Sequence, residues 1–252
     1  MYKKLKLVIR KLIPDRILFR FEPFLRRLLY PFYRGKTYRC TVCKKRLRKF
    51  IELNDGDKLC PYCGSISRNR RLWQILNDEF LKEGIRVLDF SPSRCLYRKL
   101  KKYPGIHYTS SDISGDFISD VSFDITQIST EDNSFDLIIC YHILEHVEND
   151  KQAMLELYRV MKEHGTCLVQ TPFKEGEIYE DPSVTTPQER VKHFGQEDHV
   201  RIYSVNGLKK RLENAGFRVE KREFTGENNP RYGFNNHEIL FVCIKNPKRK
   251  VK

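Results

Sequence analysis

The stretch from Arg86 to Phe173 constrains the fold more than any other part of the chain. It contains four apolar runs of strand length, separated by segments with helical periodicity. The runs are residues 86–90, 106–111, 134–142 and 165–170. Strands that alternate with helical segments are typical of a parallel sheet covered by helices. The sequence therefore predicts an α/β fold.

Acidic residues stand near the ends of these runs. Asp89 lies near the end of the first run, Asp112 follows it by 23 residues, and Asp124 comes 12 residues later. In an open parallel sheet, ligands bind outside the carboxyl ends of the strands. An acid at the end of the second strand, about 20 residues after the first, can accept both hydroxyls of a ribose. The pattern therefore predicts a nucleoside-binding site.

This ordered series resembles the class I S-adenosylmethionine-dependent methyltransferases over roughly residues 85–245. Within them it is most similar to the methyltransferase type 11-like, surface-polysaccharide-associated kind with an N-terminal four-cysteine ribbon. The resemblance implies a Rossmann-like sheet of seven strands. Two consecutive strands, residues 217–224 and 238–244, suit the antiparallel hairpin that ends this sheet in the family.

The resemblance also implies where S-adenosylmethionine binds. The loop after the first strand would contact the methionine end, Asp112 the ribose, Ile113 the adenine ring, and Asp124 with Ile125 the adenine amino group. Asp116 and Asp120 are alternatives to Asp124. The cofactor-binding set is Asp89, Phe90, Ser91, Ser93, Asp112, Ile113, Asp124, Ile125 and, under the sulfonium, Cys140, Tyr141 and His142.

One feature departs from the family pattern. The usual Asp/Glu-x-Gly-x-Gly loop reads Asp89-Phe90-Ser91-Pro92-Ser93 here, without glycine. Glycine at this place allows positive φ and a close approach of ligand to backbone. Serine is small and Pro92 fixes the turn, so we expect a cofactor-binding loop. The alternative is a domain that has lost the cofactor.

Two segments carry candidate catalytic residues. His146 ends the turn of residues 142–146, and in the family a histidine at this place lies near the cofactor or shapes the pocket. Residues 190–201 lie in a long insertion after the strand of residues 165–170, where segments that cover active sites are common. We expect His193 or His199 to be the general base and Asp198 to orient it. The alternative for each is a structural hydrogen bond or a loop charge.

Four of the eight cysteines have the spacing of a metal site. Cys40-x2-Cys43 and Cys60-x2-Cys63 flank sixteen residues. Two such pairs suit a tetrahedral zinc ion with four thiolates, which closes the coordination sphere and predicts a structural Zn²⁺. A disulfide or redox pair is the alternative. The remaining four cysteines are scattered singly, as in a protein of the cytoplasm.

The charge of the chain is concentrated at one end. Residues 1–50 hold 17 Lys/Arg and two acids, a charge of +15, within a total of +14. Residues 1–36 also carry apolar residues at helical spacing, broken near Pro14 and Pro31. The sequence predicts three parts: a basic amphipathic helical arm (1–36), a zinc ribbon (37–66) and a methyltransferase domain (67–252). We expect the arm to contact a membrane surface or to pack on protein, with nucleic acid a further alternative.

Together these features predict a methyltransferase that O-methylates a glycan, a lipid-linked sugar or a small molecule. No apolar run reaches the length of a membrane span, and charges interrupt residues 5–13, so we expect a cytoplasmic protein, peripheral on the inner membrane face. An RNA methyltransferase that grips phosphate with the arm and ribbon is one alternative. A non-catalytic binding protein is the other.

Overall fold

The computed structural model describes residues 15–225 and 230–245, with side chains from residue 19 onward. The described chain divides into two compact units. The first holds the residues up to 80, residues 93–102 and those of 225–238, and the second holds the rest. The predicted domain boundaries at residues 36 and 66 stay a prediction. The amphipathic pattern predicted for residues 1–14 lies outside the described residues.

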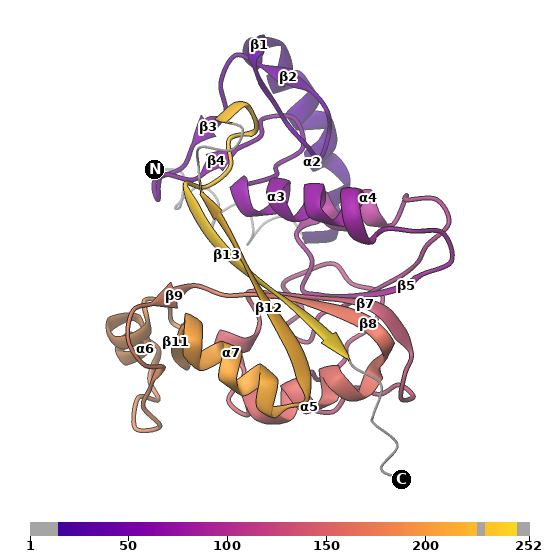
Figure 1. The fold of residues 1–252 in the computed structure, drawn as a ribbon. Coiled ribbons are helices and arrows are strands. Elements are labelled where there is room, and N and C mark those ends of the chain that lie inside the picture. The colour runs from indigo at the N-terminus through magenta and orange to yellow at the C-terminus, as the bar shows by residue number, and fades with distance from the viewer. Residues whose placement is uncertain (1–14, 226–229, 246–252) are drawn as a thin grey trace. The chain divides into compact units, whose positions relative to one another are not determined.

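The first unit consists of short helices and two small hairpins (Figure 1). The hairpins pair β1 with β2 and β3 with β4, both antiparallel. Its elements are α2 (Asp15–Leu29), the 3-10 turn η1 (Tyr30–Tyr33), β1 (Arg34–Arg39), β2 (Arg46–Leu47), β3 (Ile51–Glu52), β4 (Lys58–Leu59), α3 (Ser67–Ile75), the π-helical turn η2 (Leu76–Phe80), α4 (Arg94–Leu100) and the 3-10 turn η4 (Pro230–Tyr232).

The second unit is built on one central sheet with the order β12-β13-β8-β7-β5-β6. The strands β6, β5, β7 and β8 run parallel, and β13 is antiparallel to β8. This is the mixed α/β sheet that the sequence predicts. The elements are β5 (Arg86–Phe90), β6 (His107–Ser111), β7 (Phe135–Tyr141), the 3-10 turn η3 (Leu144–His146), α5 (Asp150–Val160), β8 (Met161–Gln170), α7 (Val205–Asn214), β12 (Phe217–Thr225) and β13 (His237–Lys245).

The number of strands differs from the prediction. Among the described residues the central sheet has six strands, whereas the resemblance implies seven. At the edge beyond β6, a single parallel bridge joins Ser111 to Val121. The segment leading to Val121 is polar and contains Gly115 with φ +78°, so it turns instead of continuing a ladder.

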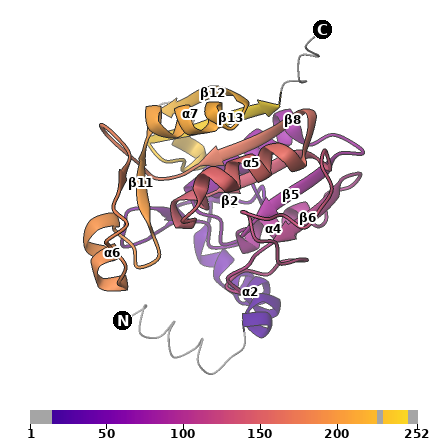
Figure 2. The same ribbon diagram turned by 90° about the horizontal axis from the view of Figure 1, so that it is seen from below.

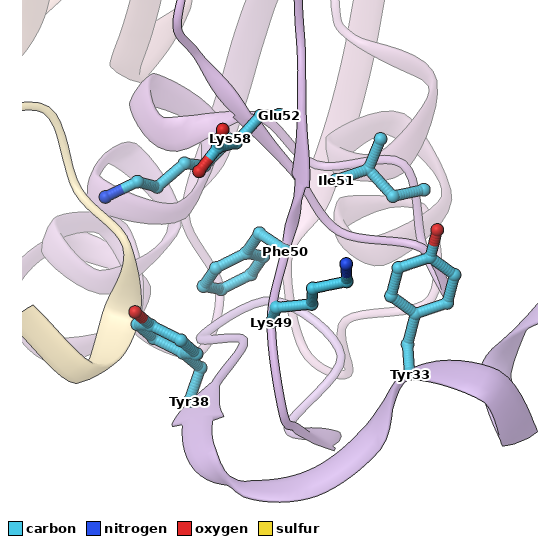
Figure 3. Close-up of a pocket in the computed structure, with 7 residues that line it drawn as sticks. All are labelled: Tyr33, Tyr38, Lys49, Phe50, Ile51, Glu52 and Lys58. Carbon is cyan, nitrogen blue, oxygen red and sulfur yellow. The ribbon is translucent and has the colours of Figure 1, made fainter.

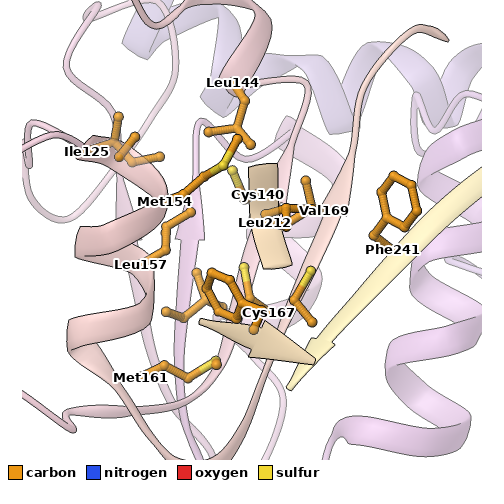
Figure 4. Close-up of a cluster of buried hydrophobic side chains, with 14 of the residues drawn as sticks. Ile125, Cys140, Leu144, Met154, Leu157, Met161, Cys167, Val169, Leu212 and Phe241 are labelled. Atoms are coloured by element: carbon orange, nitrogen blue, oxygen red, sulfur yellow. The ribbon is translucent and has the colours of Figure 1, made fainter. Parts of the chain in front are cut away.

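A buried apolar cluster holds the sheet to its helices. Leu157 of α5 and Leu212 of α7 are fully buried against Ile138 and Val169 of the strands, and both helices lie on the same face of the sheet (Figures 2 and 4). Ser204 caps α7 by accepting a hydrogen bond from the Gly207 N–H, as expected for a serine before a helical pattern. Cores of this kind rest on the burial of side chains worth about 1.5–3 kcal/mol each.

The insertion after β8 forms a small substructure of its own. Two short strands flank β11 in the order β10-β11-β9, and α6 lies between β10 and β11 in the chain. A capping box of Thr186 and Glu189 starts α6, and Gly195, with φ +86°, ends it. The elements are β9 (Phe173–Lys174), β10 (Tyr179–Glu180), α6 (Pro187–Phe194) and β11 (Arg201–Ser204).

Candidate active site and cysteine cluster

The loop after β5 has the backbone conformation that glycine favours, although the loop contains no glycine. Ser91 adopts φ +45°, in the left-handed region, and its N–H donates to the Ser111 carbonyl over 2.7 Å. A non-glycine residue costs about 1 kcal/mol or more in this region. The tight turn of the family loop is therefore kept at Ser91, although the glycine is not.

Two residues before this turn, Asp89 lies buried at the end of β5. Its Oδ2 accepts a hydrogen bond of 3.0 Å from the Tyr108 hydroxyl. Burial raises the pKa of Asp89 to about 7, and the Tyr108 hydrogen bond opposes that rise. The neighbouring Phe90 belongs to the apolar core, whereas Ser93 starts α4 in the first unit, with its hydroxyl 3.4 Å from the Cys95 sulfur.

Asp112, the predicted ribose ligand, is 5% exposed and surrounded by donors. Its Oδ1 accepts from the Ser91 hydroxyl over 2.7 Å, and its Oδ2 accepts from the Gly115 N–H over 2.7 Å. The Ser114 hydroxyl, 3.0 Å from Oδ2, and the Phe117 N–H, 3.3 Å away, complete the set. The structure thus brings the predicted residues Ser91 and Asp112 together through a direct hydrogen bond.

The residues predicted to contact adenine differ in how much of each side chain is exposed to solvent. Ile113 is 66% exposed beside Asp112, as a platform for a flat ring would be. Ile125, by contrast, is buried in the apolar core, and Asp124 folds back to accept hydrogen bonds from the Thr126 N–H and hydroxyl. Those two hydrogen bonds lower the pKa of Asp124. The structure does not bring Asp124 and Ile125 to one surface with Ile113.

The end of β7 supplies the predicted floor. Cys140 is fully buried in the core, and burial raises the pKa of its thiol. Tyr141 is half-buried at the last position of the strand. His142 follows with φ +56°, its N–H donates to the Gln170 carbonyl, and its Nδ1 lies 3.1 Å from Glu145 Oε1. A non-glycine residue held at positive φ next to a strand end is a frequent sign of a functional turn.

Beyond this turn, three of the four predicted catalytic residues meet. His146 Nδ1 lies 3.1 Å from Asp198 Oδ2, and the His146 and His199 rings stand edge to face with centroids 4.6 Å apart. His199 is 4% exposed, and its Nδ1 lies 3.3 Å from the Phe194 carbonyl oxygen. Burial, and then the neighbouring His146, lower the pKa of His199. Asp198 therefore orients His146, whereas the sequence paired it with a base at His193 or His199.

Of these three side chains, His199 lines a pocket of about 180 Å³. Glu145 and His199 line it from the two segments predicted to form the acceptor side. The remaining lining residues are Pro172, Phe194, Gly195, Gln196, Arg201 and Ile202. The pocket thus combines an apolar wall with a few convergent polar groups, as small-molecule sites do.

Arg201 fixes the turn that carries Glu145 and His146. Its Nη1 donates to the Leu144 carbonyl over 3.1 Å and to the Val147 carbonyl, and its Nη2 donates to the Glu148 carbonyl over 2.8 Å. The Val200 N–H adds a bond of 2.9 Å to the Glu145 carbonyl. Two segments more than 50 residues apart in sequence are therefore locked together.

His193 lies outside this cluster. Its Nδ1 is 2.5 Å from the Tyr179 hydroxyl, and its ring tilts against Phe194. It is absent from the lining of the pocket that contains His199. The structure therefore groups His146, Asp198 and His199, and it leaves His193 with Tyr179.

Two residues of the site could not be singled out from the sequence. Glu145 lies in the predicted turn of residues 142–146, and its spacing of three residues from His142 is the signal that could have placed the two in contact on one helical turn. Arg201 gives no local signal, because its partners lie 53 to 57 residues earlier in the chain.

The four predicted metal-ligating cysteines converge in the first unit. All four sulfurs lie within 4.8 Å of one another. The Cys40 and Cys63 sulfurs are 3.6 Å apart, and those of Cys43 and Cys60 are 3.8 Å apart. A Zn–S bond of about 2.3 Å in a tetrahedron separates the sulfurs by about 3.8 Å. The donor set therefore fits a tetrahedral zinc ion.

The two Cys-x2-Cys turns have the same backbone geometry. The Lys44 N–H donates to the Cys40 carbonyl, and the Gly64 N–H donates to the Cys60 carbonyl, each over 2.9 Å. Lys44 and Gly64 both have positive φ, +61° and +76°. This repeated turn directs both sulfurs of a pair to the same side.

Arg70 lies fully buried beside the cluster. Its guanidinium stacks on the Phe50 ring, 4.1 Å from the centroid, and burial lowers its pKa while the charges of Cys40 and Cys60 oppose that. Its hydrogen-bond acceptors are the carbonyls of Lys58, Ser65, Tyr232 and Gly233 and the Ser67 hydroxyl. The Ser65 hydroxyl in turn lies 3.3 Å from the Cys40 sulfur. A buried cation whose hydrogen-bond acceptors are all neutral is destabilising unless a negative charge lies nearby.

The first unit also contains a pocket of about 310 Å³ (Figure 3). Lys49 and Lys58 contribute amines, and Tyr33 and Tyr38 contribute aromatic rings. Phe50, Ile51 and Glu52 complete the lining. Cations among aromatic rings are the composition that single-stranded nucleic acids favour, so this is where the RNA alternative predicts contact.

With the fold and the site described, the comparisons with known proteins identify the class. Residues 66–222 match the family described as methyltransferase domain, so the chain belongs to that family. A probable S-adenosylmethionine-dependent methyltransferase of Mycolicibacterium smegmatis is 30% identical over 96 residues. That match covers 38% of this chain and 34% of the relative, so it spans about a third of the relative's length.

Solved structures agree at the level of the fold. An S-adenosylmethionine-dependent methyltransferase from Archaeoglobus fulgidus is similar with a TM-score of 0.51 and 20% identity, covering 71% of this chain and 95% of that one. Phosphoethanolamine N-methyltransferase 2 of Haemonchus contortus, solved with S-adenosyl-L-methionine, gives a TM-score of 0.50 and 15% identity, covering 71% and 53%. The second unit therefore has the class I methyltransferase fold, as the sequence predicts.

Proposed function

We propose that this chain catalyses S-adenosylmethionine-dependent methyl transfer to a hydroxyl oxygen of a glycan, a lipid-linked sugar or a small molecule. The observation that carries the proposal is the cluster of Glu145, His146, Asp198 and His199 at a pocket just beyond the end of β7. In the class I fold, the cofactor binds along the same edge of the sheet. A pocket with proton acceptors at this place suits an acceptor whose proton must leave.

Methyl transfer is a single displacement. A lone pair of the acceptor oxygen forms the new C–O bond while the C–S bond of the sulfonium breaks, and the electron pair of that bond stays on sulfur. The acceptor proton passes to a neighbouring base, which leaves a methyl ether and S-adenosylhomocysteine. The protein must align the two reactants and accept the proton, and alignment alone can supply about 7–11 kcal/mol.

The cluster supplies lone pairs for this chemistry. The lowered pKa of His199 keeps its ring neutral near pH 7, so it is able to accept a proton or bind an electrophile. The Asp198 carboxylate lies against Nδ1 of His146, which leaves Nε2 of that ring as its proton acceptor beside His199. The apolar wall formed by Pro172 and Phe194 would exclude water from the acceptor oxygen.

The decisive experiment is methyl transfer from radiolabelled S-adenosylmethionine into extracts of source cells that lack the gene. Lipid, polysaccharide, low-molecular-weight, RNA and protein fractions are counted separately, and label in any of the first three agrees with the proposal. We expect label in the lipid or polysaccharide fraction with the wild type and none with Asp112→Ala. Label confined to RNA would replace this proposal by the RNA alternative, and Tyr38→Ala in the pocket of Figure 3 should then reduce it.

An absence of label has to be interpreted through cofactor binding. Calorimetry with S-adenosylmethionine and S-adenosylhomocysteine separates the two causes. Binding without transfer indicates that the extract lacks the acceptor, and the experiment is then repeated with fractions from other growth conditions. A well-folded chain that binds neither compound would establish the non-catalytic alternative.

We also propose that the four cysteines hold a structural Zn²⁺. Four thiolates around one zinc ion carry a net charge of −2, which would compensate the buried guanidinium of Arg70. Four neutral thiols would leave that cation without a counter-charge of this size. The sulfur separations and the Arg70 position therefore support the same ion independently.

The helix α2 supports a proposal about its partner. Its charged Glu22 forms ion pairs with Arg26 at 2.8 Å and with Arg98 of α4 at 2.9 Å, inside the first unit. Its large apolar side chains instead face solvent, namely Phe21 (55% exposed), Phe24 (58%), Leu25 (54%), Leu28 (57%) and Leu29 (45%), followed by Phe32 (70%) in η1. This is the reverse of an ordinary surface helix, which buries its apolar face.

We propose that this apolar face of α2 and η1 inserts into an anionic membrane surface, which would place the enzyme on the inner face of the membrane. Exposed Arg20 and Arg27 flank the face, and the first 50 residues carry 17 Lys/Arg. Apolar side chains bordered by basic ones bind the interface of anionic bilayers. Among the described residues, no helix is long and apolar enough to cross a membrane.

Vesicle co-sedimentation tests this contact. Wild-type protein should sediment with vesicles containing phosphatidylglycerol and less with phosphatidylcholine alone. Phe24→Glu with Leu28→Glu should abolish sedimentation, whereas Leu155→Glu, at an exposed leucine of α5, should leave it unchanged. Equal sedimentation of the double variant would refute the membrane contact, and concentration-dependent dimers lost in that variant would assign the face to a second copy.

A further inference from the structure

Three ligand groups gather at the acceptor pocket. One carboxylate oxygen of Glu145 and one ring nitrogen each of His146 and His199 all lie within 4.8 Å of one another. The two rings stand at 82° to each other, so that their edges can converge on one point. Two histidines and one carboxylate are the donor set of many divalent transition-metal sites with open coordination positions.

Each histidine is held in the tautomer that a metal needs. His146 Nδ1 lies 3.1 Å from the Asp198 carboxylate, and His199 Nδ1 lies 3.3 Å from the Phe194 carbonyl. Because both acceptors require a proton on Nδ1, the lone pair of each ring is on Nε2. Metal-ligating histidines are usually oriented in this way by a carboxylate or carbonyl on the other nitrogen.

Glu145 provides the independent observation. The residue is 1% exposed, its Oε1 contacts His142 Nδ1, and its Oε2 is buried with no hydrogen-bond partner in the described part of the chain. A buried carboxylate oxygen without a partner is costly. Because Glu145 lines the pocket, this oxygen is available to coordinate a cation bound there.

We propose that Glu145, His146 and His199 bind one divalent transition-metal ion through Oε2 and the two Nε2 atoms. Bonds of about 2.0–2.2 Å would draw the three atoms to about 3.4 Å from one another, a closure of small side-chain rotations. The guanidinium of Arg201 lines the same pocket, but its donors are engaged by backbone carbonyls and by Glu180. Its donors are therefore not available to pair with Glu145 Oε2.

Three protein ligands leave coordination positions open toward the pocket. An acceptor hydroxyl could fill one of them, where the ion would polarise it. This part rests on the proposed function, whereas the binding of the ion does not. When the ion is bound, the two histidines would act as its ligands instead of as free bases, and the proton of the polarised hydroxyl would pass to solvent water.

Manganese(II) is the probe that isolates this site. Thiolates favour softer ions, so Mn²⁺ added to full-length protein that holds one Zn²⁺ per chain should avoid the four cysteines. Titration calorimetry and the electron paramagnetic resonance signal of free Mn²⁺ should both show one bound ion per chain. Zn²⁺ added in slight excess should displace it, as expected for nitrogen and oxygen ligands.

Variants assign the ion to these residues. Glu145→Gln, His146→Gln and His199→Gln should each weaken Mn²⁺ binding by more than tenfold, and Asp198→Asn, which alters only the partner of His146, by about 10–100-fold. The matched control His107→Gln changes an exposed histidine of β6 and should bind as the wild type does. Circular dichroism melting of each variant shows which ones keep their fold.

The results that would reject the metal site differ from those that would reject methyl transfer. No bound Mn²⁺ in the wild type, or equal binding by the folded His146→Gln and Asp198→Asn variants, would overturn the metal site. Metal binding without any methyl transfer would retain the site and reject the proposed function. Methyl transfer that persists after a chelator has removed the ion from this site would retain the function and reject a role of the ion in the reaction.

Discussion

The two clusters of potential ligands differ in what surrounds them. The four cysteines form a closed set, with two identical turns and sulfurs 3.6 and 3.8 Å apart in each measured pair. Glu145, His146 and His199 form an open set, with three ligand groups beside a pocket of about 180 Å³. A full coordination sphere stabilises a fold, and an incomplete one leaves room for a substrate. The difference predicts that one cluster serves stability and the other activity.

The largest expected effect concerns the closed set. Cys60→Ser should remove the zinc and lower the melting temperature by about 10 °C or more, because structural zinc binding is worth on the order of 10 kcal/mol in small domains. Metal content by mass spectrometry and calorimetric melting check this. Cys95→Ala, at a buried cysteine outside the cluster, is the control that should keep its zinc. A Cys60→Ser protein with unchanged metal and melting would refute a structural site.

Asp89, a buried acid that belongs to neither cluster, should make the stability of the fold depend on pH. Burial raises the pKa of Asp89 to about 7, above its unfolded value of about 3.9. The folded state therefore holds the proton more tightly, and stability falls as the pH rises from about 4 to about 7. Relative to Asp89→Asn, the wild type should lose up to ~4 kcal/mol over this range. Urea unfolding at several pH values measures it, with exposed Asp116→Asn as control; parallel curves for wild type and Asp89→Asn would contradict the shift.

The open set should affect turnover instead of folding. His199→Gln is expected to reduce kcat by about 10²-fold or more with unchanged cofactor affinity, because a group at the acceptor is lost. His193→Gln, whose ring contacts Tyr179, should change kcat by less than about fivefold. Methyl-transfer kinetics with the acceptor fraction compare the two. If His193→Gln were the inactive variant, the base would lie with Tyr179.

The smallest expected effect concerns cofactor affinity. Asp112→Ala should weaken binding of S-adenosylmethionine by about 1–3 kcal/mol, the scale of hydrogen bonds to a charged group. Calorimetry measures it, and Glu163→Ala, at an exposed acid near the start of β8, serves as the control. Equal affinity of Asp112→Ala and wild type would remove the ribose assignment.

The parts of the molecule that sequence predicts well are those with a local cause. The apolar runs of β5 and β7 predict these strands, and Ser204 predicts a helix start, because burial and capping act over a few residues. The seventh strand was predicted by resemblance alone, and the polar segment before Val121 does not support it.

The site divides in the same way. The four cysteines that the spacing predicted as metal ligands do lie together. The sequence could predict this because the turn geometry of each Cys-x2-Cys pair is local. The contact of Asp198 with His146 and the grip of Arg201 on the Leu144 carbonyl depend on two segments about 50 residues apart. Pairings of that kind follow from the tertiary fold, which is why the sequence named the histidines but not the contact between Asp198 and His146.

The environment of Asp112 has a consequence for how cofactor would be exchanged. In the free protein its carboxylate is held by the hydroxyls of Ser91 and Ser114, two groups with the chemistry of the two hydroxyls of a ribose. A nucleoside arriving there would substitute for the serines one for one, so the count of hydrogen bonds would not change. The carboxylate would never be left bare during turnover. The affinity that Asp112 contributes would then be the difference between its hydrogen bonds from the ribose and those from the two serines.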